Sequence, residues 1–182
     1  NDLYGGSYRM FKQIFEPLGI VFHFIDLNDP LQVKTSINNH TKLFWVETPT
    51  NPTMQIVDIV RCAQYAKSCG ALLAVDNTFA SPFLQNPLLL GADIVMHSAT
   101  KYLGGHGTTL AGVIVESGRF PWDNGKFPGM TEPSEGYHGV RWYETFGDFG
   151  FTMRCRMETL RVYGATLAPA SAWQILQGIE TL

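Results

Sequence analysis

The sequence predicts an α/β fold, with a mostly parallel sheet and helices on both faces. Short apolar runs rich in β-branched and aromatic residues recur along the chain, each short enough to be a buried strand. A helical pattern separates two of them, and alternation of this kind builds mostly parallel sheets. The expected strands, in chain order, cover residues 20–25, 43–46, 71–75, 94–96 and 112–115.

The clearest helical pattern covers residues 58–70. Asp58 can accept hydrogen bonds from the first free backbone N–H groups, and Gly70 can close the last turn. Two more helices are expected near the end of the chain, one over 152–163 that stops at Gly164 and one over 171–182 with an apolar stripe.

Residues 117–150 have a different composition, dense in glycine, proline and aromatic side chains. The segment is too apolar for a disordered linker. We therefore expect it to pack over a site or a neighbouring subunit.

Composition narrows the class of protein. The 182 residues include 13 basic and 16 acidic side chains, without the dense Lys/Arg clusters of nucleic-acid or membrane-surface proteins. No apolar run approaches the roughly 20 residues that span a bilayer, and the chain does not open on a secretory leader. The three cysteines form no C-x-x-C pair, so neither disulfides nor a metal site is expected, and a reducing cytoplasm fits best.

The strongest chemical signal is Lys101, just past an expected strand, with Ser98 and Thr100 before it and glycines after it. A desolvated lysine amine is a nucleophile, and nearby hydroxyls can bind a phosphate. These are the needs of a Schiff-base lysine that holds a phosphorylated aldehyde. The alternative is a surface turn in which the hydroxyls satisfy backbone groups and the lysine is solvated.

A second signal favours the chemical interpretation. Asp76 ends another expected strand, and a carboxylate can keep a pyridine nitrogen protonated. Taken alone, an aspartate after a strand is more often an ordinary helix or turn cap, because this is common in α/β loops. Because Asp76 and Lys101 follow adjacent expected strands, they can converge on one ligand.

Three motifs now occur in order: Glu-Thr-Pro-Thr-Asn-Pro-Thr at 47–53, Ala-Val-Asp-Asn-Thr-Phe at 74–79 and Ser-Ala-Thr-Lys at 98–101. Together they resemble the pyridoxal-phosphate (PLP) enzymes of cysteine and methionine metabolism. The resemblance implies the large domain of a fold type I PLP-dependent transferase. Residues 1–165 would be its central part, including the insertion at 117–150, and residues 166–182 would begin the helix that leads to a C-terminal domain.

The resemblance also implies roles for individual residues. Lys101 would be the catalytic Schiff-base lysine, and Asp76 would face the pyridine nitrogen of pyridoxal 5'-phosphate. Ser98 and Thr100 would hold the phosphate. Such contacts stabilise this cofactor and tune its electronic properties.

Two more positions are assigned by the same resemblance. Asn51 would face the phenolic oxygen of the cofactor. Tyr4 would stack on the pyridine ring and is the second candidate catalytic residue, because an aromatic face suits a cationic ring.

Within the family, residues 101–108 and the insertion most resemble O-acetylhomoserine sulfhydrylases. This implies γ-replacement, in which O-acetylhomoserine and sulfide or methanethiol give homocysteine or methionine and acetate. Gly6 stands where methionine γ-lyases tend to carry cysteine, which counts against a degradative lyase. The insertion itself is a candidate for selecting the acyl group or the sulfur donor.

Alternatives remain open. The first is a methionine or cystathionine γ-lyase, or a cystathionine γ-synthase, with the same cofactor. The second is an inactive α/β binding or assembly module. For the intact protein, the resemblance further implies a homotetramer in methionine biosynthesis, with an amino-acid substrate and sulfide. The charge balance and cysteine usage described above favour a cytoplasmic protein with no nucleic acid or membrane partner.

Overall fold

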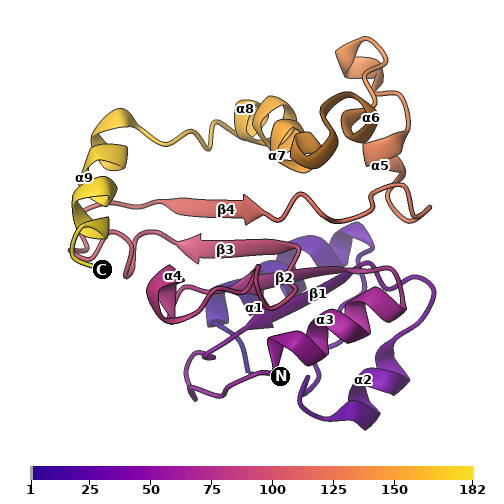
Figure 1. The fold of residues 1–182 in the computed structure, drawn as a ribbon, viewed down its shortest axis with the longest axis horizontal. Coiled ribbons are helices and arrows are strands. Elements are labelled where there is room, and N and C mark those ends of the chain that lie inside the picture. The colour runs from indigo at the N-terminus through magenta and orange to yellow at the C-terminus, as the bar shows by residue number, and fades with distance from the viewer. Residues whose placement is uncertain (1) are drawn as a thin grey trace.

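The computed structural model describes residues 2–182 and contains a four-stranded sheet in the order β1-β2-β3-β4 (Figure 1). The strands are β1 (Leu43–Glu47), β2 (Leu72–Asp76), β3 (Ile94–Ser98) and β4 (Gly112–Glu116). The first three run parallel, and β4 pairs with β3 antiparallel. The predicted α/β class with a mostly parallel sheet is confirmed.

Short helices make up most of the remaining regular structure. None of those in residues 2–182 is both long and apolar enough to cross a membrane. The α-helices are α1 (Gly5–Met10), α2 (Pro30–Ser36), α3 (Ile59–Ser68), α4 (Ser81–Leu84), α5 (Pro128–Thr131), α6 (Trp142–Phe146), α7 (Gly150–Arg154), α8 (Arg161–Tyr163) and α9 (Pro169–Ile179). Wider π-type turns cover Phe11–Phe15 and Cys155–Leu160, and 3-10 turns cover Glu16–Leu18, Glu135–Tyr137 and Gly147–Phe149.

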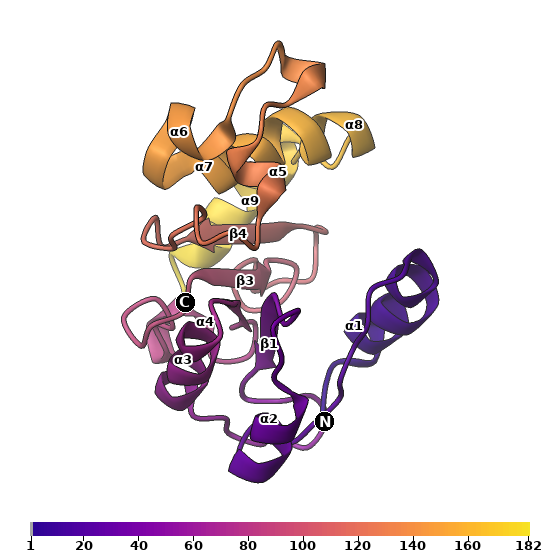
Figure 2. The same cartoon turned by 90° about the vertical axis from the view of Figure 1, so that its right-hand side faces the viewer.

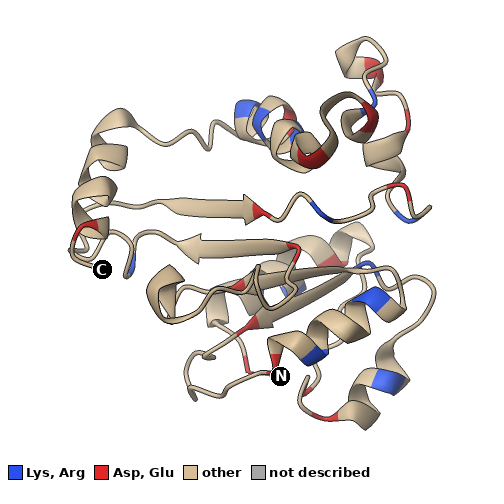
Figure 3. Ribbon diagram, viewed as in Figure 1, with Lys and Arg blue, Asp and Glu red and all other residues tan. Residues whose placement is uncertain are grey.

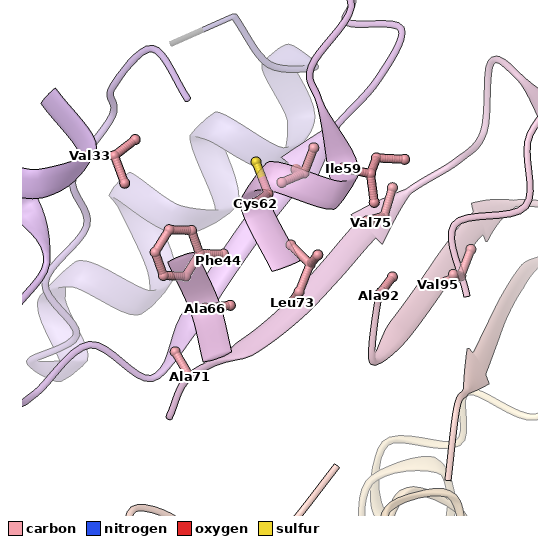
Figure 4. Close-up of a cluster of buried hydrophobic side chains, with 11 residues drawn as sticks. Val33, Phe44, Ile59, Cys62, Ala66, Ala71, Leu73, Val75, Ala92 and Val95 are labelled. Atoms are coloured by element: carbon pink, nitrogen blue, oxygen red, sulfur yellow. The ribbon is translucent and has the colours of Figure 1, made fainter. Parts of the chain in front are cut away.

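Helix α3 covers one face of the sheet. Asp58 caps it as the sequence predicts, since its carboxylate accepts the Arg61 N–H at 3.0 Å. The buried Cys62 and Ala66 pack in one apolar cluster with alternate side chains of β2, Leu73 among them (Figure 4). Burial raises the pKa of the Cys62 thiol to about 12, so this cysteine is a packing residue and not a nucleophile.

The insertion at 117–150 contributes side chains to the other face of the sheet, and its helices α5 and α6 lie beyond β4 in Figure 2. Its Phe120, Trp122 and Trp142 pack against Leu72 and Ala74, the β2 side chains that point away from α3. All five residues of β2 are therefore buried, as expected for a strand covered on both sides. The segment is thus part of the domain core.

Residues 20–25 do not form the strand that their composition predicts. A strand needs a neighbouring backbone to hydrogen-bond. Residues 19–27 and most of β1 instead line a common cavity of about 660 Å³. The aromatic side chains of the segment pack on the first helix, with Phe22 stacked on Phe11 at 4.9 Å between ring centroids.

The two predicted C-terminal helices both form. The first runs from α7 through the π-type turns to α8 and ends at Gly164 in the left-handed conformation. On the second, α9, Ile175 is buried but Trp173 and Leu176 remain exposed. Acidic and basic residues are interspersed along the described chain, and α9 carries none (Figure 3).

Candidate active site

Three polar residues end the three parallel strands at one edge of the sheet. Glu47 ends β1, Asp76 ends β2 and Ser98 ends β3. Glu47 is registered with Asp76, and Asp76 is registered with Met96, two residues before Ser98. Ligands of open parallel sheets bind outside this carboxyl edge, so the polar strand ends define a candidate site.

Asp76 is only 6% exposed. Its Oδ1 accepts two hydrogen bonds from Thr78, one from the backbone N–H at 3.0 Å and one from the hydroxyl at 2.5 Å. No residue from 2 to 182 donates a hydrogen bond to Oδ2. Asp76 therefore caps its turn, as the alternative interpretation expects, and still has an oxygen that can accept a proton donor from a ligand.

Thr78 was not singled out from the sequence, yet it connects two of the proposed cofactor residues. Its hydroxyl donates to Asp76 and accepts the Ser98 N–H at 2.8 Å. A hydroxyl two residues after an aspartate is typical of a local turn. The sequence could therefore show the turn but not the bond to β3.

Lys101 lies in the loop that follows β3. Its backbone N–H donates to the Ser98 carbonyl at 3.0 Å, and its carbonyl accepts the Gly105 N–H at 2.8 Å. The side chain is exposed, and Nζ forms no hydrogen bond or ion pair with the residues that the structure describes. The loop thus fixes the backbone of Lys101 and leaves its amine open to a ligand.

Helix α9 packs against this loop, at the side of the molecule where the C-terminus lies (Figure 1). Ile175 packs with Ala99 and Leu103 in a small apolar cluster. Gly178 lies so close to Gly104 that a side chain at 178 would overlap the Gly104 carbonyl. The close approach of two glycines therefore ties the C-terminal helix to the lysine loop.

The two hydroxyls assigned to a phosphate differ in their surroundings. Thr100 Oγ1 accepts the Ala111 N–H at 3.0 Å and donates to the Ala111 carbonyl at 3.4 Å. Within residues 2–182, Ser98 Oγ forms no hydrogen bond. Ser98 is thus ready to bind an anion, whereas Thr100 must give up its long bond to Ala111 to do so.

Asn51 and Tyr4 both connect to the strand end at Glu47. The Asn51 N–H donates to Oε1 at 2.8 Å, and the Tyr4 N–H donates to Oε2 at 2.9 Å. Glu47 is nearly fully buried, which raises the pKa of its carboxyl group. The sequence motif contained Glu47, but no role for it followed from the pattern.

The Tyr4 side chain is 49% exposed and lies over Gly6. A Cβ atom at position 6 would clash with the Tyr4 ring. Glycine at this position therefore permits the ring position seen here, whereas a cysteine would displace the ring.

Comparison with known proteins now identifies the class. The model of the Cys/Met metabolism PLP-dependent enzyme family matches residues 1–182, and the chain belongs to this family. It is 45% identical over 190 aligned positions to an O-acetyl-L-homoserine sulfhydrylase from Leptospira meyeri, covering the whole chain and 43% of that protein.

Solved structures agree with this assignment. A structure described as an O-acetylhomoserine (thiol)-lyase from Campylobacter jejuni, which contains a pyridoxyl-lysine phosphate, matches with a TM-score of 0.94 and 34% identity, over the whole chain and 45% of that protein. Cystathionine γ-lyase from Lactobacillus plantarum matches with a TM-score of 0.75 and 32% identity, over 99% of the chain and 39% of that protein. The chain spans less than half the length of these relatives.

The donor set at the sheet edge fits the family's cofactor. Asp76 Oδ2 can accept the N–H of a pyridinium, the amine of Lys101 can bond to an aldehyde carbon, and the Ser98 hydroxyl can donate to a phosphate. Among residues 2–182, no group of three or more side chains is arranged to hold a metal ion.

Proposed function

We propose that the whole protein is a PLP-dependent transferase that replaces the acetate of O-acetylhomoserine by sulfide or methanethiol. Acetate leaves from Cγ as a proton is lost from Cβ, and the sulfur of sulfide or methanethiol then bonds to Cγ as a proton returns to Cβ, giving homocysteine or methionine and acetate. The proposal rests on one observation above all. The buried Asp76 and the exposed Lys101 follow neighbouring parallel strands, each with polar atoms that the described residues do not use.

Each residue of the site has a task in this reaction. Lys101 Nζ would bind the cofactor and, once the substrate amine has displaced it, move protons at Cα and then at Cβ. Asp76 would hold the proton on the pyridine nitrogen, while Tyr4 would stack on the ring. The bound cofactor supplies an electron sink that delocalises the negative charge left on the substrate.

The remaining contacts would orient the cofactor. Ser98, assisted by Thr100, would donate to the phosphate, and Asn51 would face the phenolic oxygen. Contacts on three sides of the cofactor ring would hold the ring in a single orientation. Fixed orientation of the reacting groups accounts for a large part of the rate advantage of bound reactants.

The sulfhydrylase reaction is favoured over a γ-lyase by two features. Position 6 is glycine, where methionine γ-lyases tend to carry cysteine, and the TM-score is higher for the Campylobacter thiol-lyase than for the cystathionine γ-lyase. We further propose a cytoplasmic homotetramer, supported by exposed apolar side chains such as Trp173 and Leu176. Residues 1–165 would belong to the cofactor domain and 166–182 to the helix that leaves it.

Product analysis tests the proposal. The purified protein, loaded with pyridoxal phosphate, is given O-acetylhomoserine with and without sulfide. Homocysteine that forms only with sulfide supports a transferase, whereas 2-oxobutyrate supports a lyase. A protein that shows no visible absorbance band with pyridoxal phosphate would instead be a non-catalytic module.

A further inference from the structure

Two chain segments that are distant in sequence meet on a single buried carboxylate. Glu47 Oε2 accepts the N–H of Tyr4, 43 positions away, and Oε1 accepts the N–H of Asn51 at the following turn. These are the residues proposed to stack on the cofactor ring and to face its phenolic oxygen. Each of the two carboxylate oxygens therefore holds the backbone of a different cofactor-facing residue.

The position of Glu47 makes this contact rigid. Glu47 is the last residue of β1, it is 7% exposed, and it is registered with Asp76 on β2. Its side chain therefore starts from the sheet itself, and a loop would hold it less precisely. Tyr4 and Asn51, by contrast, lie outside the strands.

A contribution to the stability of the fold does not explain well why the Glu47 carboxyl group is buried. No lysine, arginine or histidine within residues 2–182 forms an ion pair with Glu47, and Asp76 and Asp2 add negative charge nearby. Burying a charge without a cation is costly. A buried carboxyl group whose two oxygens each accept one backbone N–H from a different segment indicates a demand for fixed geometry.

We infer that Glu47 is a positioning residue that fixes Tyr4 and Asn51 relative to each other, and so sets the two sides of the cofactor pocket. The inference rests on the proposed function for the identity of the ligand. The backbone clamp itself does not depend on that identity, because its hydrogen bonds are formed by the chain alone.

The test uses Glu47→Ala and Glu47→Gln, with Glu116→Ala as a matched control. Glu116 also ends a strand, and it also accepts a backbone N–H, that of Thr152 at 3.0 Å. It belongs to β4, outside the candidate site. Hydrogen exchange of the peptides that contain Tyr4 and Asn51 is measured without cofactor, and the affinity for pyridoxal phosphate is then measured by absorbance.

Glu47→Ala is expected to speed exchange at both peptides and to weaken pyridoxal phosphate binding about tenfold or more, because the two backbone N–H groups lose their common acceptor. Glu47→Gln keeps one accepting oxygen and nearly the same shape, so it should give an intermediate affinity even if the alanine variant fails to fold. Glu116→Ala should leave both readouts near wild type.

The clamp would be overturned if Glu47→Ala left the exchange rate of one or both peptides unchanged. It would also be overturned if Glu47→Gln left the exchange rates of both peptides unchanged. Cofactor affinity in Glu47→Ala equal to that of Glu116→Ala would overturn the positioning role. Failure of the proposed function looks different, since the wild-type protein would then show no Lys101-dependent absorbance band while the exchange measurement still decides the clamp.

Discussion

Two lysines at opposite edges of the sheet have contrasting surroundings. Lys126, in the insertion, donates from Nζ to the Thr41 carbonyl at 2.9 Å and to the Cys69 carbonyl at 2.5 Å. These carbonyls precede β1 and β2, so Lys126 attaches the insertion to the side of the sheet where the parallel strands begin, here called the amino edge. Lys101 lies at the carboxyl edge, is exposed, and donates no Nζ hydrogen bond within the described chain.

The difference separates a structural lysine from a chemical one. An ammonium that already donates to two backbone carbonyls is held in place and has little capacity for a ligand. An amine with no internal partner can bond to a ligand without breaking the fold. Location past a parallel strand favours the second role for Lys101, since ligands bind at that edge.

Replacing Lys101 by alanine should have the largest effect on function. Loss of proton transfer alone should lower turnover by about 10²–10⁴, and the visible band with pyridoxal phosphate should disappear. The melting temperature should hardly change, because the described residues lose no Nζ contact. Turnover near the wild-type rate would refute the assignment of Lys101.

The aspartates at the two ends of the parallel strands should differ in their effect on cofactor affinity, which Asp76→Asn tests at the carboxyl edge. The amide can still accept from Thr78, but it cannot hold the proton of a pyridinium. Cofactor affinity should fall about ten- to a hundredfold, the worth of a charge-assisted hydrogen bond. Asp93→Asn is the control, since Asp93 precedes β3 and accepts the Leu73 N–H at 2.8 Å at the amino edge. Equal affinity losses in both variants would count against a specific role for Asp76.

Lys126→Met should lower stability and leave cofactor binding unchanged, the opposite of what is expected for Lys101→Ala. Two backbone carbonyls lose their charged donor, so the free energy of unfolding should fall by about 1–3 kcal/mol. Urea denaturation measures this loss. Cofactor affinity should stay at the wild-type value, and a large loss of affinity with unchanged stability would reverse the roles of the two lysines.

The smallest expected effects are two pH dependences of stability, from groups at the two ends of β3. Burial lowers the pKa of the His97 imidazole below its usual 6.5, although the nearby Asp76 opposes the shift. The unfolded chain therefore binds more protons than the folded one as pH falls below 6.5. Stability should decrease from pH 6.5 toward the folded pKa, and His97→Asn should flatten this part of the urea-denaturation profile. An equally steep profile in the variant would contradict it.

Asp93, at the other end of β3, should act with the opposite sign. Burial raises the pKa of its carboxyl group above 3.8, so the folded chain binds more protons in the interval above that value. Stability should fall as pH rises through this interval. Asp93→Asn should remove that decrease, and no change between the variant and wild type would contradict it.

Patterns that depend on neighbouring residues in sequence were predictable. The strands at 43–46, 71–75, 94–96 and 112–115 and the helix capped by Asp58 all form within about two residues of their predicted bounds. Adjacency of β2 and β3 was expected from the alternation of strands and helices.

Features that depend on long-range contacts were not predictable. Residues 20–25 have a strand-like composition, but they are not part of a strand. Likewise, sequence gives no sign that Glu47 accepts the distant Tyr4 N–H, or that Thr78 reaches Ser98. That the insertion packs over a site or a neighbouring subunit stays a prediction; within the chain, its Lys126 binds the carbonyls of Thr41 and Cys69, which precede β1 and β2.

Covalent labelling measures the contrast between the lysines directly. The protein is incubated with pyridoxal phosphate, reduced with borohydride, digested and analysed by mass spectrometry. We expect the pyridoxyl group on the peptide that contains Lys101, in near-stoichiometric amount, and little on the peptide that contains Lys126. Labelling spread evenly over surface lysines, or absent from Lys101, would contradict the assignment of the carboxyl edge as the cofactor site.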